Sequence, residues 1–366
     1  MPNFPVFFWK LLERGQVRRS TAFDASLESF YQWVWAQPKI ETHVHMEAAV
    51  DPSFYLQRTA PGAWSESLPW QRLPFESLRG FIRAWVDLSK SMRSLNDFEC
   101  LAEAFVAERA FANIRYSEVY VSPADFSFIR KRFAIAPEIF DFEDLLRAYI
   151  RGLKRALAEN TGIEVRLIVD SLWISDAEER KIILQSLKNV IQDSQCSDSS
   201  GHSYVIGVGL GGMESHDSLQ EKMEFFADVR ALGLKIDIHS GEGGDSKIHV
   251  GSLNALQPDR VAHGFAGAEE GYFFEKNLVM CPLSNLLLKT FAGEPDEHPV
   301  FDCLKRGLPI CIGSDDPLLL SSSLALDYTF LHAFAGNGRE IFAFTQKNTR
   351  ERVLSATALA RVEKFL

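Results

Sequence analysis

The chain has 366 residues, 46% of them hydrophobic, and a formal net charge of -10 at pH 7. This length is common for one large α/β barrel, and the hydrophobic content is sufficient for a sizeable core. The acidic balance argues against nucleic acids and anionic membrane surfaces as partners, because those polyanions attract basic proteins. No apolar stretch approaches the roughly 20 residues that a membrane-spanning helix needs.

The cysteines are dispersed, and their number is odd. They stand at Cys100, Cys196, Cys281, Cys303 and Cys311. No pair has metal-binding spacing, and such a scattered set predicts buried free thiols in a reducing compartment. We therefore expect a cytoplasmic location, whereas the sequence carries no signal for the oligomeric state.

Residues 1–37 are rich in aromatic side chains and lack the basic start and cleavage pattern of a signal peptide. We interpret them as a packing extension or short helix on a barrel domain of residues 38–366. A first strand in residues 39–47 precedes a mainly helical segment, 48–113, whose aromatic residues are expected in the core. A segment in this place can also form a lid. The aromatic residues are Phe54, Tyr55, Trp64, Trp70, Phe75, Phe81 and Trp85.

Seven further strands are predicted from alternating or apolar runs that end at turn residues. They cover 115–122, 164–170, 204–210, 234–239, 260–263, 278–281 and 310–315. Helices are predicted over 137–158 and 176–192, and the polar run 193–201 reads as a solvated loop. Eight strands separated mostly by helices predict an α/β fold, an eight-stranded parallel (β/α)8 TIM barrel with extra helices.

Two histidines in the first strand begin the candidate site. In the stretch KIETHVHME, His43 and His45 are two residues apart and therefore project to the same side of a strand. Neighbouring imidazoles at a strand end suit zinc or a similar divalent metal. Taken alone, the pair is equally consistent with a half-buried strand that carries two hydrogen-bonded histidines.

Polar residues also follow three later strands. IDIHSGE carries His239 and Glu242, VAHG carries His263, and ICIGSDDP carries Asp315 and Asp316. The carboxyl ends of barrel strands meet at one rim, which holds the active site of a TIM barrel. Taken singly, His263 would be interpreted as a buried core histidine, and the Asp-Asp-Pro run would be interpreted as a turn. Together these residues predict one polar site, because burying them without partners would cost several kcal/mol.

In chain order, the motifs THVHMEA, LGGME, HSGE, AHGF, CPLSN and GSDDPLLL resemble those of the adenosine deaminase family of metal-dependent hydrolases. The motifs span roughly residues 38–330. The resemblance implies an eight-stranded barrel with one catalytic zinc ion. It also implies that His43, His45, His239 and Asp315 are the zinc ligands.

The resemblance implies roles for the neighbouring residues as well. His263 and Asp315 would orient the attacking hydroxide below C6 of a 6-aminopurine, and Glu242 would protonate N1. Asp316 would bind N7, and the Gly212 amide would meet N3, where a side chain would block the approach of the backbone. Glu242 must hold a proton before the attack, so its pKa is expected to be raised.

Signals for the exact substrate conflict. His45 and Glu47 are assigned to the substrate pocket, with Glu47 on the ribose side, where it would repel a 5'-phosphate. Glu47 and the CPLSN motif resemble adenine deaminating relatives, whereas PLLL at 317–320 and Asp327 with its neighbours resemble nucleoside enzymes. Ser240 stands where alanine is common, a change the site is expected to tolerate. Adenosine is the first candidate, and adenine and a modified nucleoside such as aminodeoxyfutalosine are the alternatives.

Three other classes of protein are alternatives to this family. The run GVGLGG at 207–212 satisfies the dinucleotide-binding fingerprint, with Asp237 about 25 residues further on, but it lies mid-chain. The Pro-Cys-x-x-Cys pattern of cysteine-ligated base deaminases is absent. A barrel that has lost catalysis is the third alternative. Five histidines away from the strand ends read as surface or packing residues: His202, His216, His249, His298 and His332.

Overall fold

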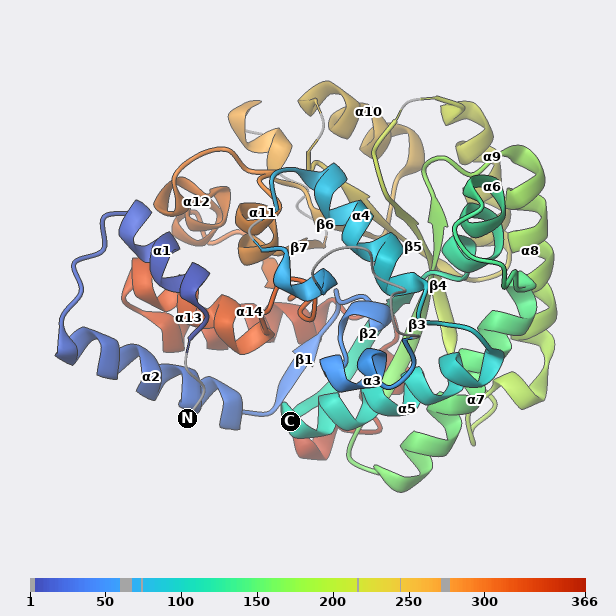
Figure 1. The fold of residues 1–366 in the computed structure, drawn as a ribbon, viewed down its shortest axis with the longest axis horizontal. Helices are drawn as coiled ribbons and strands as arrows, with labels where there is room; N and C mark the ends of the chain where they lie inside the picture. Colours follow the sequence, from blue (N-terminus) through green and yellow to red (C-terminus); the bar gives the residue numbers. More distant parts are fainter. Residues whose placement is uncertain (1–3, 60–67, 74, 216, 244, 271–276) are drawn as a thin grey trace.

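The computed structural model describes residues 4–59, 68–73, 75–215, 217–243, 245–270 and 277–366 (Figure 1). Trp64 and His216 lie outside these residues. The described strands form one eight-stranded parallel sheet in sequential order. The strands are β1 (Lys39–Glu41), β2 (Ile114–Val121), β3 (Glu164–Leu172), β4 (Val205–Gly211), β5 (Lys235–Ser240), β6 (Arg260–His263), β7 (Leu278–Met280) and β8 (Ile310–Ile312).

A parallel bridge closes the barrel beyond the ends of its first and last strands. Val44 pairs with Asp315, and the amide of His45 donates to the carbonyl of Asp315 at 2.9 Å. The predicted TIM barrel is therefore confirmed, and all eight predicted strands are present. The same bridge brings the segment after β1 beside the segment after β8, which is where the polar motifs lie.

Helices surround the sheet, and the two that the sequence predicted explicitly are present as α7 and α8. The helix α7 begins at Phe142 because the Asp141 carboxylate accepts the amides of the first turn, which defines the start of a helix. The helices are α1 (Val6–Arg14), α2 (Thr21–Ala36), α3 (Pro52–Leu56), α4 (Leu78–Ser89), α5 (Leu95–Phe111), α6 (Arg130–Phe133), α7 (Phe142–Glu159), α8 (Ala177–Gln192), α9 (Leu219–Ala231), α10 (Ser246–Leu256), α11 (Pro282–Leu287), α12 (Pro299–Lys305), α13 (Leu324–Ala335), α14 (Gly338–Glu351) and α15 (Ala356–Leu359).

The N-terminal residues form α1 and α2, which lie at one side of the barrel near α13 (Figure 1). Phe8, Leu12 and Val34 are fully buried in the same core as the barrel residues. Lys39 joins α2 to β1, because its ammonium group donates to two carbonyls in the last turn of α2, at 2.9 and 3.0 Å, and to that of the following residue, Gln37, at 2.7 Å. A cation at this end of a helix complements the free carbonyls and the helix dipole.

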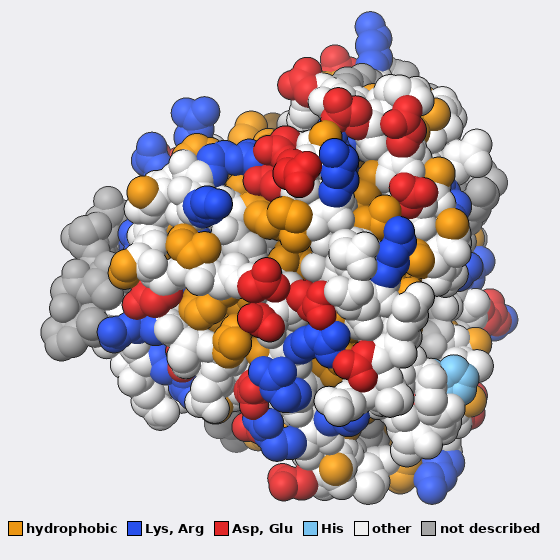
Figure 2. Space-filling view, turned by 90° about the vertical axis from the view of Figure 1, so that its right-hand side faces the viewer, with side chains coloured by type: hydrophobic (Ala, Val, Ile, Leu, Met, Phe, Trp, Pro, Cys, Tyr) orange, Lys and Arg blue, Asp and Glu red, His pale blue; other side chains and the backbone are white. Residues whose placement is uncertain are grey.

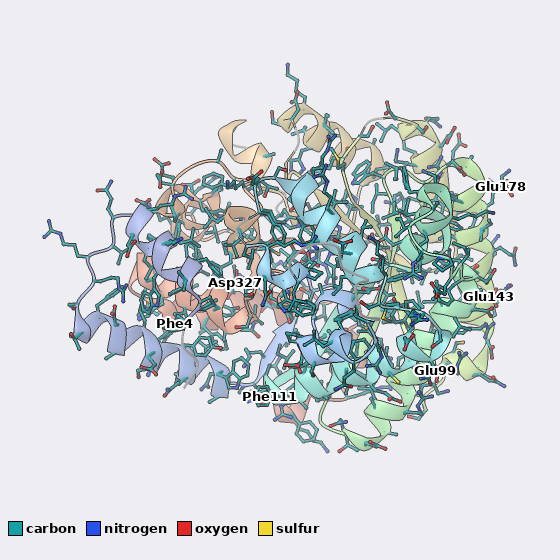
Figure 3. The ribbon with its side chains drawn as sticks, in the orientation of Figure 1. Phe4, Glu99, Phe111, Glu143, Glu178 and Asp327 are labelled. Carbon is teal, nitrogen blue, oxygen red and sulfur yellow. The ribbon has the colours of Figure 1, made fainter. Side chains whose placement is uncertain are left out.

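Charged side chains of both signs are interspersed on the outer face shown in Figure 2. Several link neighbouring helices: Glu99 of α5 accepts from Arg151 and Arg155 of α7, each at 2.7 Å. Glu99, Glu143 and Glu178 mark this outer ring in Figure 3. Such exposed pairs contribute little stability. None of the described helices is both long and apolar enough to cross a bilayer.

One charge cluster is buried inside the barrel. The Arg260 guanidinium contacts both Asp237, at 2.6 and 2.8 Å, and Glu118. Replacing Arg260 with Met should lower the free energy of unfolding by about 3–5 kcal/mol, because two carboxylates would lose their counter-charge in the interior. Urea unfolding measures this loss.

Arg155→Met is the matched control, because Arg155 forms its ion pairs at the exposed surface. This substitution should lower the free energy of unfolding by less than about 1 kcal/mol. An equal loss for the two variants would contradict the structural role of the buried cluster.

Candidate active site

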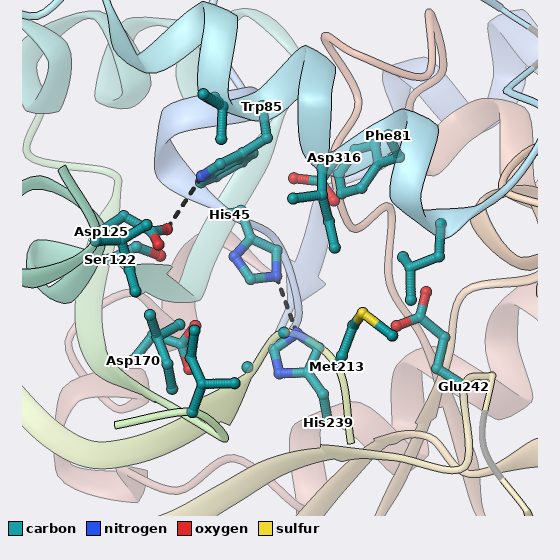
Figure 4. A pocket seen from close by; sticks show the side chains of 18 of the residues that line it. His45, Phe81, Trp85, Ser122, Asp125, Asp170, Met213, His239, Glu242 and Asp316 are labelled. Carbon is teal, nitrogen blue, oxygen red and sulfur yellow. Dashed lines mark hydrogen bonds between the residues drawn. The ribbon is translucent and has the colours of Figure 1, made fainter. Parts of the chain in front are cut away.

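The four predicted metal ligands lie together at the carboxyl end of the barrel. His43 and His45 follow β1, His239 lies in β5, and Asp315 follows β8. All four are buried, and one ligand atom from each lies within 4.8 Å of the others. Nε2 of His45 is 2.9 Å from Nε2 of His239 (Figure 4). Nε2 of His43 is 3.1 Å from Oδ1 of Asp315.

The protonation of this cluster suits a divalent cation. Burial lowers the pKa of His45 to about 3 and that of His239 well below its usual value, so both imidazoles are neutral. Burial opposes ionisation of Asp315, but the hydrogen bond from His43 and the nearby imidazoles hold its pKa well below the usual range. Three imidazole nitrogens and one carboxylate converge, which is a donor set typical of zinc.

Two of the strand-end residues have unusual backbone conformations. His263 and Asp315 have φ values of 66° and 63°, in the left-handed region that side chains rarely adopt. Such a conformation costs about 1–3 kcal/mol and is found most often at functional sites. The strain aims both side chains into the cluster, where a regular continuation of β6 and β8 would turn them elsewhere.

Glu242 lies next to the cluster, with its Oε2 atom 3.8 Å from Nε2 of His263. Burial raises the pKa of Glu242 to about 7, against an opposing effect of His263. The expectation of a raised pKa is therefore supported. Glu214 positions the loop, because its carboxylate accepts the Glu242 amide at 3.0 Å and the Ser240 hydroxyl at 3.0 Å. Ser240 thus has a hydrogen-bonding role that the sequence did not indicate.

A chain of hydrogen bonds determines the tautomer of His263. The Val300 amide donates to Nδ1 of His298 at 3.2 Å, so Nε2 of the neutral His298 carries the proton. That nitrogen lies 3.3 Å from Oδ1 of Asn285, whose amide nitrogen lies 3.0 Å from Nδ1 of His263. His263 therefore carries its own proton on Nε2, which faces Glu242. His298 is a packing residue, as expected, but it also positions His263.

Asp316 and Gly212 line the same cavity. Burial and the nearby acids Asp315 and Glu242 raise the pKa of Asp316 well above its usual value, so it carries a proton, as a donor to a ring nitrogen would. Gly212 has a φ of 82°, and a Cβ there would meet no described atom within 4 Å. The positive φ of Gly212, and not crowding by other protein atoms, therefore explains why this position holds a glycine.

Glu47 is placed differently from the expectation. Its side chain is buried and accepts hydrogen bonds from the Ser122 amide at 2.9 Å and the Tyr149 hydroxyl at 2.5 Å. Ser122 lines the cavity, but Glu47 is not among the described lining residues. Burial raises the pKa of Glu47 to about 7. Glu47 thus lies behind the cavity wall, and direct repulsion of a phosphate has no support from this geometry.

The cavity has a volume of about 470 Å³ and extends from the metal cluster to the ends of β2 and β3. Helix α4 covers it with Leu78, Phe81, Ile82, Trp85 and Val86. Part of the aromatic segment therefore lines the site, whereas Phe54, Tyr55 and Phe75 are core residues as expected. Other aromatic and acidic residues of the wall are labelled in Figure 4.

Two acids of the cavity were not predicted as site residues. Asp125 follows β2, and Asp170 lies near the end of β3. Asp170 ends a predicted strand, which is the same signal that identified His239 and Asp315. By contrast, Asp327 accepts the Leu283 amide at 3.2 Å and does not line the cavity, so it supports the wall.

The dinucleotide interpretation is wrong. Gly207, Gly209 and Gly211 all lie inside β4, and Gly212 follows it directly, whereas α9 starts only at Leu219. The fingerprint requires these glycines in a tight turn that opens a helix. The candidate ribose-binding acid, Asp237, is paired with Arg260 inside the barrel.

The barrel, the cluster of metal-type donors and the adjacent acid Glu242 are together typical of a metal-dependent hydrolase. The sequence profile of the adenosine deaminase family matches residues 38–359, so the chain belongs to that family. It is therefore a hydrolase that acts on carbon–nitrogen bonds, and a deaminase. The family resemblance noted from the motifs is confirmed.

Relatives extend over nearly the whole chain. An adenine deaminase of Rhizobium meliloti is 28% identical over 341 residues, which cover 87% of this chain and 97% of the relative. The crystal structure of an adenine deaminase from Arthrobacter aurescens has a TM-score of 0.71 at 20% identity, with 90% of this chain and 98% of that one covered. A zinc-bound amidohydrolase from Burkholderia ambifaria gives 0.72 at 20% identity, with 95% and 94% covered. These structural similarities concern the fold.

Proposed function

We propose that the protein is a zinc-dependent deaminase that converts a 6-aminopurine and water into the 6-oxopurine and ammonia. The observation that carries this proposal is that Glu242, whose pKa burial raises to about 7, lies beside a buried cluster of three histidines and one aspartate. Adenosine is the first candidate substrate. Free adenine is the second, because relatives such as the Rhizobium meliloti protein are adenine deaminases.

His43, His45, His239 and Asp315 would hold the metal. A bound zinc ion lowers the pKa of water toward about 7, which makes hydroxide available at neutral pH. Iron or manganese can use the same ligands, but the histidine-rich set favours zinc.

The protein's own groups supply the remaining chemistry. Glu242 donates its proton to N1, which makes C6 electrophilic. His263, with its Nε2 proton directed into the site, donates a hydrogen bond to the attacking oxygen and therefore stabilises it rather than removing a proton. Asp316 donates to N7, and the Gly212 amide donates to N3. Once the oxygen has added to C6, its proton passes through the Glu242 carboxylate to the amino nitrogen, the C6–N bond breaks, and ammonia leaves. The proton that water lost in forming hydroxide then restores the acid form of Glu242.

Ammonia release tests this function. We expect the zinc-loaded protein to release ammonia from adenosine, deoxyadenosine, adenine or aminodeoxyfutalosine, and expect a chelator to abolish the release. AMP is included as the nucleotide member of the panel. Zinc-loaded protein that releases no ammonia from any member would contradict the proposal and would favour a barrel without catalysis.

A further inference from the structure

The cavity has a second polar end, which the proposed deamination chemistry does not use. Asp125 and Asp170 lie on one side of it and Glu242 on the other, with the imidazoles of His45 and His239 between them (Figure 4). Trp85 of the covering helix donates to Asp125 at 3.0 Å. Burial raises the pKa of Asp170 well above its usual value, and the nearby carboxyl group of Asp125 adds to this rise.

Asp170 has the features of a ligand-binding group. Its side chain is only 3% exposed, yet Oδ1 has no hydrogen-bond partner among the described residues. A buried carboxyl group without a partner is costly, so a partner supplied by a bound ligand would remove this cost. Because Asp170 also lines the cavity, a ligand bound in the cavity can supply that partner.

The glycine-rich strand β4 makes room for Asp170. A Cβ on Gly209 would lie 2.9 Å from Oδ1 of Asp170, and a Cβ on Gly211 would lie 2.1 Å from Oδ2. Neither position can hold a larger residue with Asp170 in this conformation. The alternating glycines that resemble a dinucleotide motif therefore serve to seat this carboxyl group against the backbone beside Gly212.

The order of the strands places this acid pair opposite a defined part of a purine. Around the edge of the ring, the nitrogen atoms follow the order N1, N3, N9 and N7. Their proposed partners Glu242, Gly212 and Asp316 follow β5, β4 and β8, which leaves the sector of β3 and β2 for N9. Gly211, which precedes Gly212 in the chain, lies against Asp170. In the purine, N3 and N9 are likewise close, because both are bonded to C4.

The lack of cations in the described cavity wall limits what can occupy this sector. None of the described lining residues is a lysine or an arginine, whereas five are acids, ionised or protonated: Asp125, Asp170, Glu242, Asp315 and Asp316. A phosphate carries a charge of about -1.5 to -2 at pH 7 and needs cations or several amide donors. Carboxyl oxygens instead accept hydrogen bonds from N–H or hydroxyl groups.

We propose that Asp125 and Asp170 form the N9-side subsite, which accepts a neutral hydrogen-bond donor of the substrate and excludes a 5'-phosphate. The donor is the N9–H of a free base or a sugar hydroxyl of a nucleoside. This inference rests on the proposed deaminase function, because the orientation of the purine derives from it. It assigns substrate selection to the ends of β2 and β3.

Binding of the deaminated products tests the subsite without requiring turnover. Calorimetry on the zinc-loaded protein compares hypoxanthine, inosine, 9-methylhypoxanthine and inosine 5'-monophosphate. We expect hypoxanthine or inosine to bind at least about tenfold more tightly than the last two, since one buried hydrogen bond is worth about this factor. Preference for hypoxanthine identifies N9–H as the donor, and preference for inosine identifies a hydroxyl.

Asp170→Val should abolish the preference among the four products, because it weakens the binding of the favoured ligand. Asp170→Asn, which keeps an accepting oxygen, should largely retain the preference. Asp176→Asn is the matched control, because Asp176 starts α8 outside the cavity and asparagine caps a helix equally well. Equal binding of all four products, or an unchanged preference in Asp170→Val, would overturn the subsite.

The same samples separate the two proposals. If no adenine compound releases ammonia while the product preference responds to Asp170→Val, the proposed function fails and the subsite stands. If ammonia is released but Asp170→Val changes kcat/KM by the same factor for adenine, adenosine and 9-methyladenine, the deaminase function stands and the subsite fails.

Discussion

Replacement of Glu242 with Gln is expected to lower kcat by about 10²–10⁴-fold or more, with the metal content unchanged. The amide keeps the size of the side chain and its hydrogen-bonding position but has no proton to give to N1. Because the pKa of Glu242 is raised to about 7, the protonated form is available at neutral pH in the wild type. Ammonia release and metal analysis on one preparation measure both quantities.

The matched control is Glu178→Gln on the outer face of α8, where the side chain is exposed and distant from the cavity (Figure 3). This variant should retain wild-type activity. The wild type should also lose activity as the pH rises above about 7, because the required proton is then lost from Glu242. Substantial activity in the Glu242→Gln variant would remove Glu242 from the role of proton donor.

Replacement of His239 with Ala is expected to reduce the bound metal from one ion per chain to a small fraction and to abolish deamination. The imidazole of His239 supplies one of four converging donor groups, and its Nε2 is 2.9 Å from that of His45. Metal analysis after dialysis measures occupancy. Thermal unfolding gives a second readout, because a ligand that binds only the folded protein raises Tm.

His202→Ala serves as the control, since the His202 side chain is exposed in the loop before β4 and makes no contribution to the cluster. It should bind metal as the wild type does, and zinc should raise its Tm equally. Full metal occupancy in the His239→Ala variant would contradict the assignment of His239 as a ligand. Lost activity with retained metal would instead indicate a role in orienting the substrate.

The barrel could be predicted from local patterns because each strand is a short apolar run that ends at a turn residue. The two predicted helices were also correct in type, although α7 starts five residues later than expected, at Phe142 after its Asp141 cap. Strand ends are informative in this fold for a geometric reason. A polar residue at the carboxyl end of any strand reaches the same rim, whatever its distance along the chain.

Residues that act through others were harder to recognise. His298 lies in a short turn before α12, and its link to His263 passes through Asn285, so no sequence spacing reveals it. Glu47 is two residues from His45 and was therefore expected in the pocket. The chain turns directly after His45, and Glu47 instead faces Ser122 and Tyr149 from the neighbouring elements.

The sequence by itself determined the (β/α)8 architecture, the family and the set of metal-binding candidates, because these depend on periodicity, strand ends and ordered motifs. Only the tertiary structure decided which acids face the cavity. Asp170 and Glu47 are both buried acids near strand ends, yet one lines the cavity and the other lies behind it. The difference arises from packing: glycines of β4 leave space for Asp170, whereas Ser122 and Tyr149 enclose Glu47.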